Sequence, residues 1–351
     1  MGYVLLNNQG KESKISKKTA QEFFGCTGDV KKILCLPFAG IGQASGHTVK
    51  TIYEIREYKR KKKVEGVCVI RMGGIGDLIM LSSGLRELGW RGEKVTLATL
   101  PQHMSLMKAM KVCDVIPIND IGRYTFDRVI DLRFAVEPKE MGAICKGDWT
   151  DYTTKDRSDI FDELLDVHPA PKRFTLPVAK KQGDTVVINA AMVSAARSII
   201  PKYVPVICKK IIKETGRPVV LIGQSQPWSN GLGVLGMPGL QNLIDKTDLK
   251  EMIDIISGAA IVVTPDTGTL HIAAALGKKT VALFGNIDPM TRVSYYPTVR
   301  ALYPQGELPC VNFPCWDLHT CMTGKPQEGS KCMQLFTPQR VVEAVKESLG
   351  C

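Results

Sequence analysis

Long apolar runs are absent from this 351-residue sequence. A membrane-spanning helix needs roughly 18 to 20 consecutive apolar residues, and no stretch approaches that length. The apolar part of the first eight residues is also too short for the core of a secretion signal. We therefore expect a soluble, cytoplasmic protein without a transmembrane segment.

Acidic residues are outnumbered, with 35 Asp+Glu against 46 Lys+Arg and a formal net charge of +11. Residues 1–66 hold 13 basic and 6 acidic residues, so this segment alone carries +7. Its basic run comprises Lys59, Arg60, Lys61, Lys62 and Lys63. Such a run attracts nucleic acid, an anionic membrane surface or a phosphorylated glycan, or else it is a solvated helix end before a strand.

Paired C-x2-C knuckles, the usual sign of a structural zinc site, are also missing. Most of the 11 cysteines are scattered singly, which favours reduced thiols. Four are clustered as C-x4-C-x5-C-x10-C around His319: Cys310, Cys315, Cys321 and Cys332. This cluster is either a zinc site of unusual spacing or a group of packing cysteines in a loop.

From residue 67 onward, apolar β-branched runs alternate with helical patterns, which is typical of parallel sheets built from βα units. Predicted strands cover 67–70, 94–98, 114–118, 128–132, 185–188, 218–222, 260–263 and 280–284, with helices at 78–88, 161–165, 201–215, 248–257 and 269–276. We predict two doubly wound α/β domains, 67–178 and 179–351, facing a central cleft where such sheets bind ligands. Residues 1–66 form a basic extension of the acceptor region.

The first chemical motif is the turn from Arg71 to Asp77, between a predicted strand and helix. Its glycines, Gly73, Gly74 and Gly76, allow close backbone approach, and the helix N-terminus suits an anion or a developing oxyanion. Asp77 is either a reactive carboxylate or an N-cap. The turn lacks the G-x-G-x-x-G pattern, so it does not indicate a dinucleotide cofactor.

The second motif runs from Thr264 to Gly277 and again joins a predicted strand to a helix. Asp266 can accept hydrogen bonds from ligand hydroxyls. The residues that follow it can present N–H and hydroxyl groups to a diphosphate at the helix N-terminus. The alternative is a satisfied N-cap with a packed His271.

Together the two turns resemble glycosyltransferase family 9, the heptosyltransferases with the GT-B fold. The family's donor motif D-[ST]-G-x-x-H-x-A-A-A-L-G is similar to residues 266–277 without a break, and 284–289 match the F-G-x-x-D-P that follows. The four late cysteines resemble its Cys-rich tail, and 337–341 resemble the start of its last helix. The resemblance covers about residues 67–350.

The resemblance implies transfer of a sugar from a nucleotide-diphosphate donor with inversion, without a metal or a bound cofactor. By the family pattern, Asp77 is the general base and Asp266 holds donor sugar hydroxyls. On the donor side, the diphosphate is assigned to Thr267, Gly268 and Thr269, with His271 nearby supporting them. Arg197 is assigned to neutralise the leaving phosphates, and Lys202 is the second candidate for that role. Gly223 is expected to border the nucleobase. The acceptor side comprises Gly73, Gly74 and Gly76 together with the basic run.

The acceptor half departs from the family. Ile200 replaces the tryptophan of a K-x-W-P-like stretch, a basic extension precedes the first strand, and the segment between Leu132 and Phe161 is short. We favour a polyanionic acceptor, namely a hydroxymethylated pyrimidine in phage DNA. Against this, aromatic residues make up only 7% of the sequence, so few side chains are available for bases to stack on. A phage enzyme would act in the host cytoplasm. The alternative is a transferase of the lipopolysaccharide core, and the second alternative is a non-catalytic module that binds a sugar nucleotide or nucleic acid.

Overall fold

A computed structural model describes residues 3–6, 12–15, 50–51, 62–133, 135–136, 153–178, 181–190, 197–225, 236–304, 314–315 and 329–351. The chain forms two compact units. The first comprises 1–72, 88–105 and 113–152, and the second comprises 73–87, 106–112 and 153–351. The predicted domain boundary between 178 and 179 stays a prediction. Among the described residues, no helix is long and apolar enough to cross a membrane.

The first unit contains two sheets. Strands β1 (Tyr3–Leu6), β2 (Glu12–Ile15) and β3 (Lys50–Thr51) form a small antiparallel sheet. The second sheet is parallel, with the order β6-β5-β4-β7. Its strands are β4 (Lys62–Ile70), β5 (Val95–Thr99), β6 (Asp114–Pro117) and β7 (Tyr124–Asp131). Cys68, Ile70 and Ala98 form the centre of its small core.

The described end of the basic run lies in a strand and not at a helix end. Lys62 and Lys63 begin β4 and pair with Tyr124 and Thr125 of β7. Lys63 Nζ lies 3.6 Å from Asp127 Oδ1, and both side chains are exposed. Lys59, Arg60 and Lys61 lie outside the described residues.

The second unit is built on a six-stranded parallel sheet of order β10-β9-β8-β11-β12-β13. Its strands are β8 (Val186–Asn189), β9 (Val219–Ile222), β10 (Leu240–Asn242), β11 (Ile261–Pro265), β12 (Lys279–Leu283) and β13 (Val299–Leu302). The strand order reverses between β8 and β11, the place where doubly wound sheets bind their ligands. The predicted α/β fold with parallel sheets is confirmed.

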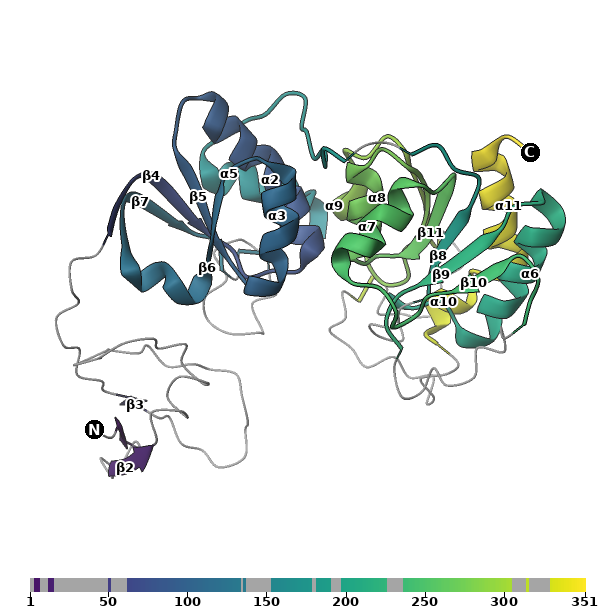
Figure 1. Ribbon diagram of the computed structural model, residues 1–351, viewed down its shortest axis with the longest axis horizontal. Helices are drawn as coiled ribbons and strands as arrows, with labels where there is room; N and C mark the ends of the chain where they lie inside the picture. The colour runs from purple at the N-terminus through teal and green to yellow at the C-terminus, as the bar shows by residue number, and fades with distance from the viewer. Residues whose placement is uncertain are drawn as a thin grey trace. The chain divides into compact units, whose positions relative to one another are not determined.

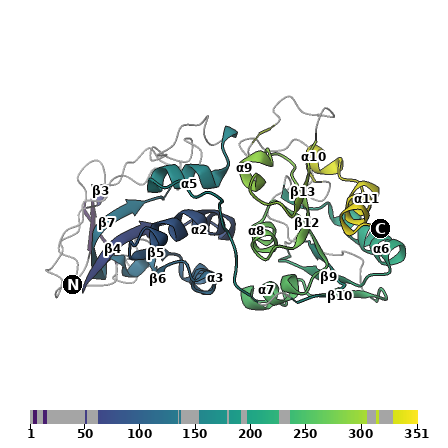
Figure 2. The same cartoon turned by 90° about the horizontal axis from the view of Figure 1, so that it is seen from above.

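Helices cover both faces of this sheet (Figures 1 and 2). The α-helices of the described residues are α2 (Ile75–Trp90), α3 (Met104–Met110), α5 (Arg157–Leu165), α6 (Val204–Thr215), α7 (Leu249–Ser257), α8 (Gly268–Ala275), α9 (Met290–Val293), α10 (Lys331–Gln334) and α11 (Pro338–Leu349). Helices α6 and α11 pack side by side on one face, and α7 and α8 lie on the other.

Local sequence explains where several of these helices begin and end. Asp248 and Glu251 form a capping box at the start of α7. Thr337 caps α11, and Gly350 ends it in the left-handed conformation. Asp156 caps α5 by accepting from Ser158 N.

Candidate active site

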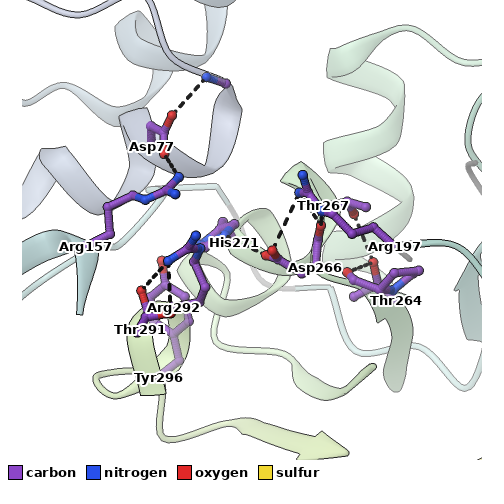
Figure 3. Close-up of polar contacts among 12 residues, drawn as sticks. Asp77, Arg157, Arg197, Thr264, Asp266, Thr267, His271, Thr291, Arg292 and Tyr296 are labelled. Atoms are coloured by element: carbon purple, nitrogen blue, oxygen red, sulfur yellow. Dashed lines mark hydrogen bonds and ion pairs between the residues drawn. The ribbon is translucent and has the colours of Figure 1, made fainter. Parts of the chain in front are cut away.

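Asp266 follows β11 and is nearly buried, with 4% of its surface exposed. Arg197 Nε and Nη2 donate to its main-chain oxygen at 3.0 and 2.5 Å, and Nη2 lies 3.6 Å from Oδ2 (Figure 3). Burial by itself would raise the pKa of Asp266, but Arg197, aided by His271 and Arg292, holds that pKa well below its usual range. Asp266 is therefore an ionised acceptor at neutral pH, suited to ligand hydroxyls.

His271 lies between Asp266 and a buried tyrosine. Its Nε2 is 3.8 Å from Asp266 Oδ1, and its Nδ1 is 2.9 Å from Tyr296 Oη. Burial raises the pKa of Tyr296 well above its usual value, so the phenol keeps its proton. The two ring nitrogens of His271 thus face Tyr296 Oη and Asp266 Oδ1, one on each side. His271 thus supports the aspartate from within the core.

Arg292 on α9 belongs to this group, although the sequence pattern did not indicate it. Its side chain is buried, and Nη1 donates to the main-chain oxygen of Thr291 at 2.9 Å and to its Oγ1 at 3.0 Å (Figure 3). Its charge helps to lower the pKa of Asp266. The signal for it was a basic residue three positions after the end of the F-G-x-x-D-P stretch. Asp288 of that stretch accepts from Met290 N through Oδ1 at the start of α9.

The hydroxyls of Thr267 and Thr269 lie against Asn189, a second residue that sequence reasoning missed. Asn189 Nδ2 donates to Thr267 Oγ1 and Thr269 Oγ1, each at 2.9 Å. All three side chains are buried. The signal that could have found it was an asparagine directly after an apolar strand, at the ligand-binding edge of the sheet.

Asp77 lies in the first turn of α2 as its third residue, and the helix begins at Ile75. It is therefore not the N-cap: its Oδ2 accepts from the N–H of Gly74 at 3.2 Å, as the third residue of a capping box does. Its Oδ1 accepts from Arg157 Nη1 at 2.5 Å (Figure 3). Arg157, the first residue of α5, was not indicated by any sequence pattern.

Of the glycines in the first turn, Gly76 shows a close approach that explains it, and Gly74 does not. A Cβ added to Gly76 would lie 2.5 Å from His271 Cδ2 and 2.8 Å from Nε2. Gly74 has nothing within 4 Å of such a Cβ. The second unit therefore brings the start of α2 close to His271 on α8, and any larger residue at 76 would separate them.

The other predicted residues lie at varied places. Lys202 is exposed, with Nζ 5.8 Å from the ring centroid of Tyr203, whereas Arg197 contacts Asp266 directly. Gly223 has φ +123°, and its oxygen accepts from Asp245 N. Of the late cysteines, Cys332 is buried and Cys315 half-buried, while Cys310 and Cys321 lie outside the described residues, so the zinc hypothesis stays a prediction.

Parallel sheets of this topology define a doubly wound α/β protein, with a charged turn where the strand order of the second unit reverses. Solved structures with the same fold are GT-B heptosyltransferases. The alignment with the ADP-heptose lipopolysaccharide heptosyltransferase II of E. coli covers 81% of this chain and 98% of that protein, with a TM-score of 0.63 and 20% sequence identity. The iron-containing dodecameric glycosyltransferase TibC of enterotoxigenic E. coli covers 100% of this chain and 93% of its own, with a TM-score of 0.59 and 15% identity.

Sequence comparison matches one part of the chain to glycosyltransferase family 9. Residues 209–317 match the model of Glycosyltransferase family 9 (heptosyltransferase). Lipooligosaccharide heptosyltransferase 2 of Campylobacter jejuni is 32% identical over 110 residues, which is 31% of this chain and 32% of that protein. Lipopolysaccharide heptosyltransferase 2 of Escherichia coli is 33% identical over 89 residues, 24% of this chain and 25% of that protein. The matched region thus spans about a third or less of these relatives' length.

Proposed function

We propose that this chain is an inverting, metal-independent glycosyltransferase that moves a sugar from a nucleotide diphosphate to a hydroxyl group. The observation that carries the proposal is Asp266, a buried carboxylate beside the N-terminus of α8 with Arg197 against it. An ionised carboxylate accepts from sugar hydroxyls, while the helix N-terminus and the guanidinium attract the diphosphate. Heptose is the first candidate for the sugar because the relatives named above are heptosyltransferases.

In this mechanism Asp77 accepts the proton of the acceptor hydroxyl. The acceptor oxygen attacks the anomeric carbon from the face opposite the diphosphate, and the bond from that carbon to the phosphate oxygen breaks. The proton ends on the Asp77 carboxylate, and the electron pair leaves with the diphosphate. Arg197 and the N–H groups at the start of α8 stabilise the negative charge of the leaving group.

For the acceptor, we place a lipopolysaccharide-core glycan ahead of DNA. In the described part of the basic run, Lys63 Nζ lies 3.6 Å from Asp127 Oδ1 of β7. This pairing offsets part of the positive charge that would attract DNA phosphates. The names of the relatives also favour the glycan, and neither they nor the described residues support a DNA acceptor.

The test is product formation by the purified chain, followed by mass spectrometry. ADP-heptose is offered with a heptose-free core oligosaccharide in one reaction and with DNA containing hydroxymethylated pyrimidines in another. We expect addition of one heptose to the glycan only. Transfer to DNA would restore the DNA hypothesis, and donor binding without any product would favour the non-catalytic binding module.

A further inference from the structure

Asn189 lies at the C-terminal end of β8, where the strand order of the six-stranded sheet reverses. Strands β8 and β11 pair in parallel there, with Ile188 opposite Val263. The residues that follow the two strands therefore meet at the same edge of the sheet. Asn189 is 2% exposed, so its amide must find its partners within the protein.

The hydrogen bonds around Asn189 have a definite direction. An amide nitrogen only donates, so Thr267 Oγ1 and Thr269 Oγ1 both accept from Asn189 Nδ2. Thr264 Oγ1 donates to the oxygen of Pro265 at 2.9 Å. The 3.1 Å contact between the hydroxyls of Thr264 and Thr267 must then be donated by Thr267. The hydroxyl proton of Thr267 is consequently used inside the protein.

This network explains an unusual helix start. Thr267 is the N-cap of α8, yet its side chain makes no capping bond. A threonine N-cap ordinarily accepts from the second or third N–H of its helix. Here the hydroxyl is turned toward Asn189 and Thr264, and within the first turn Leu270 N donates to the main-chain oxygen of Thr267. The side chain that normally covers the helix N-terminus is thereby held away from it.

We propose that Asn189 is a positioning residue for the donor diphosphate. By holding the hydroxyls of Thr267 and Thr269, it keeps the start of α8 uncapped by side chains, so that main-chain N–H groups face the phosphates. The sequence-based assignment gave both N–H and hydroxyl groups of residues 267–269 to the diphosphate. In this proposal the start of α8 contributes its N–H groups, and the hydroxyl of Thr267 is used inside the protein. Asn189 itself touches no substrate. The inference rests on the proposed donor site and deepens it.

Nucleotide binding tests the proposal without requiring an acceptor. The affinities of ADP and adenosine are measured by calorimetry for the wild type, Asn189→Ala and Asn189→Asp, with UDP and GDP as further probes. We expect ADP affinity to fall by about 10-fold or more in both variants, because the threonine hydroxyls lose their donor and are free to cap the helix. Adenosine, which lacks phosphates, should bind the variants as it binds the wild type.

Two further variants separate positioning from general damage. Thr280→Val removes another buried hydroxyl, which donates to the oxygen of Lys278, and it should leave ADP affinity unchanged. Asn189 Nδ2 also donates to Thr264 Oγ1 at 3.3 Å, and this contact is kept in a Thr267→Val, Thr269→Val background. In that background Asn189→Ala should have no further effect on ADP affinity, because the two threonine hydroxyls through which Asn189 acts on the start of α8 are already gone.

Several results would overturn the inference. Wild-type ADP affinity in both Asn189 variants, or equal losses for ADP and adenosine, would remove the positioning role while leaving the donor site in place. The positioning role would also be removed if Asn189→Ala lowered ADP affinity as much in the Thr267→Val, Thr269→Val background as it does in the wild type. If the wild type binds none of ADP, UDP and GDP, the proposed donor site fails, and the role of Asn189 fails with it.

Discussion

Arg157 Nη1 lies 2.5 Å from Asp77 Oδ1, and both side chains are largely buried. The start of α5, which carries Arg157, is itself held in place: Asp156 Oδ1 accepts from Ser158 N, and Asp156 Oδ2 accepts from Ser294 N. The N–H of Gly74 contacts the second oxygen of Asp77. A carboxylate held through both oxygens has a defined orientation, which a general base requires.

Replacing Asp77 by asparagine should abolish nearly all transfer and leave donor affinity unchanged. The amide keeps the shape of the side chain but cannot accept the acceptor proton, and removal of a general base typically costs about 10²–10⁴-fold in rate. The measurements are kcat with saturating substrates and Kd for the donor. Retention of more than roughly a third of the wild-type kcat, far outside that range, would show that the base lies elsewhere.

Arg157→Ala should lower kcat by about 10-fold or more because it removes a charged hydrogen bond that orients Asp77. Arg157→Lys keeps the charge but loses the planar guanidinium, so it should recover part of the rate. Donor affinity should stay at the wild-type value in both. If donor affinity falls and kcat does not, Arg157 contacts the donor and does not position the base.

Arg197→Gln and Lys202→Gln form a matched pair for the leaving phosphates. Arg197 contacts Asp266, whereas Lys202 is exposed beside Tyr203. The loss of Arg197 should therefore reduce kcat/KM for the donor by about 10²-fold, and the loss of Lys202 should change it by less than about 3-fold. The measurement is steady-state kinetics with varied donor concentration. A larger loss of kcat/KM in Lys202→Gln than in Arg197→Gln would assign the leaving phosphates to Lys202.

Asp266→Asn should change how stability depends on pH. Because the pKa of Asp266 is lower in the folded state than its ordinary 3.8, the wild type gains stability from this group above pH 4 and loses it as the pH falls through the folded-state pKa. The variant should have a free energy of unfolding about 1.5–3 kcal/mol lower at pH 7. Urea titrations from pH 7 to pH 3 should show that the difference in free energy of unfolding between the wild type and the variant becomes smaller. A difference that grows in acid would contradict a lowered pKa for Asp266.

Treatment with EDTA tests whether transfer depends on a metal ion, including any metal bound at the late cysteines. Since the proposed mechanism stabilises the leaving group with Arg197 and helix N–H groups, EDTA should leave initial transfer rates unchanged. Elemental analysis of the purified chain tests zinc at Cys310, Cys315, Cys321 and Cys332. A rate that only added Mg²⁺ or Mn²⁺ restores would contradict the mechanism.

The fold and the two turns that carry Asp77 and Asp266 were predictable because their signals are local. Apolar strands alternating with helical segments imply parallel sheets, and the observed strands lie within about four residues of the predicted ones, apart from the longer start of β4. Strands β10 and β13 escaped prediction because three or four residues, partly exposed, carry too little pattern. Asp77 and Asp266 stand out because each follows a strand and comes at a helix start.

Only the tertiary structure brought Arg157 to Asp77, Arg292 to Asp266 and Asn189 to the threonines of α8. Each pair is separated by between 26 and 80 residues in the chain, and nothing in the local pattern of one partner specifies the other. Their meeting depends on the order of strands in the sheet and the packing of helices against it. The amino-acid sequence by itself thus determined the local elements and the positions of the two candidate carboxylates, whereas the long-range packing of the fold decided which charges and hydrogen bonds surround them.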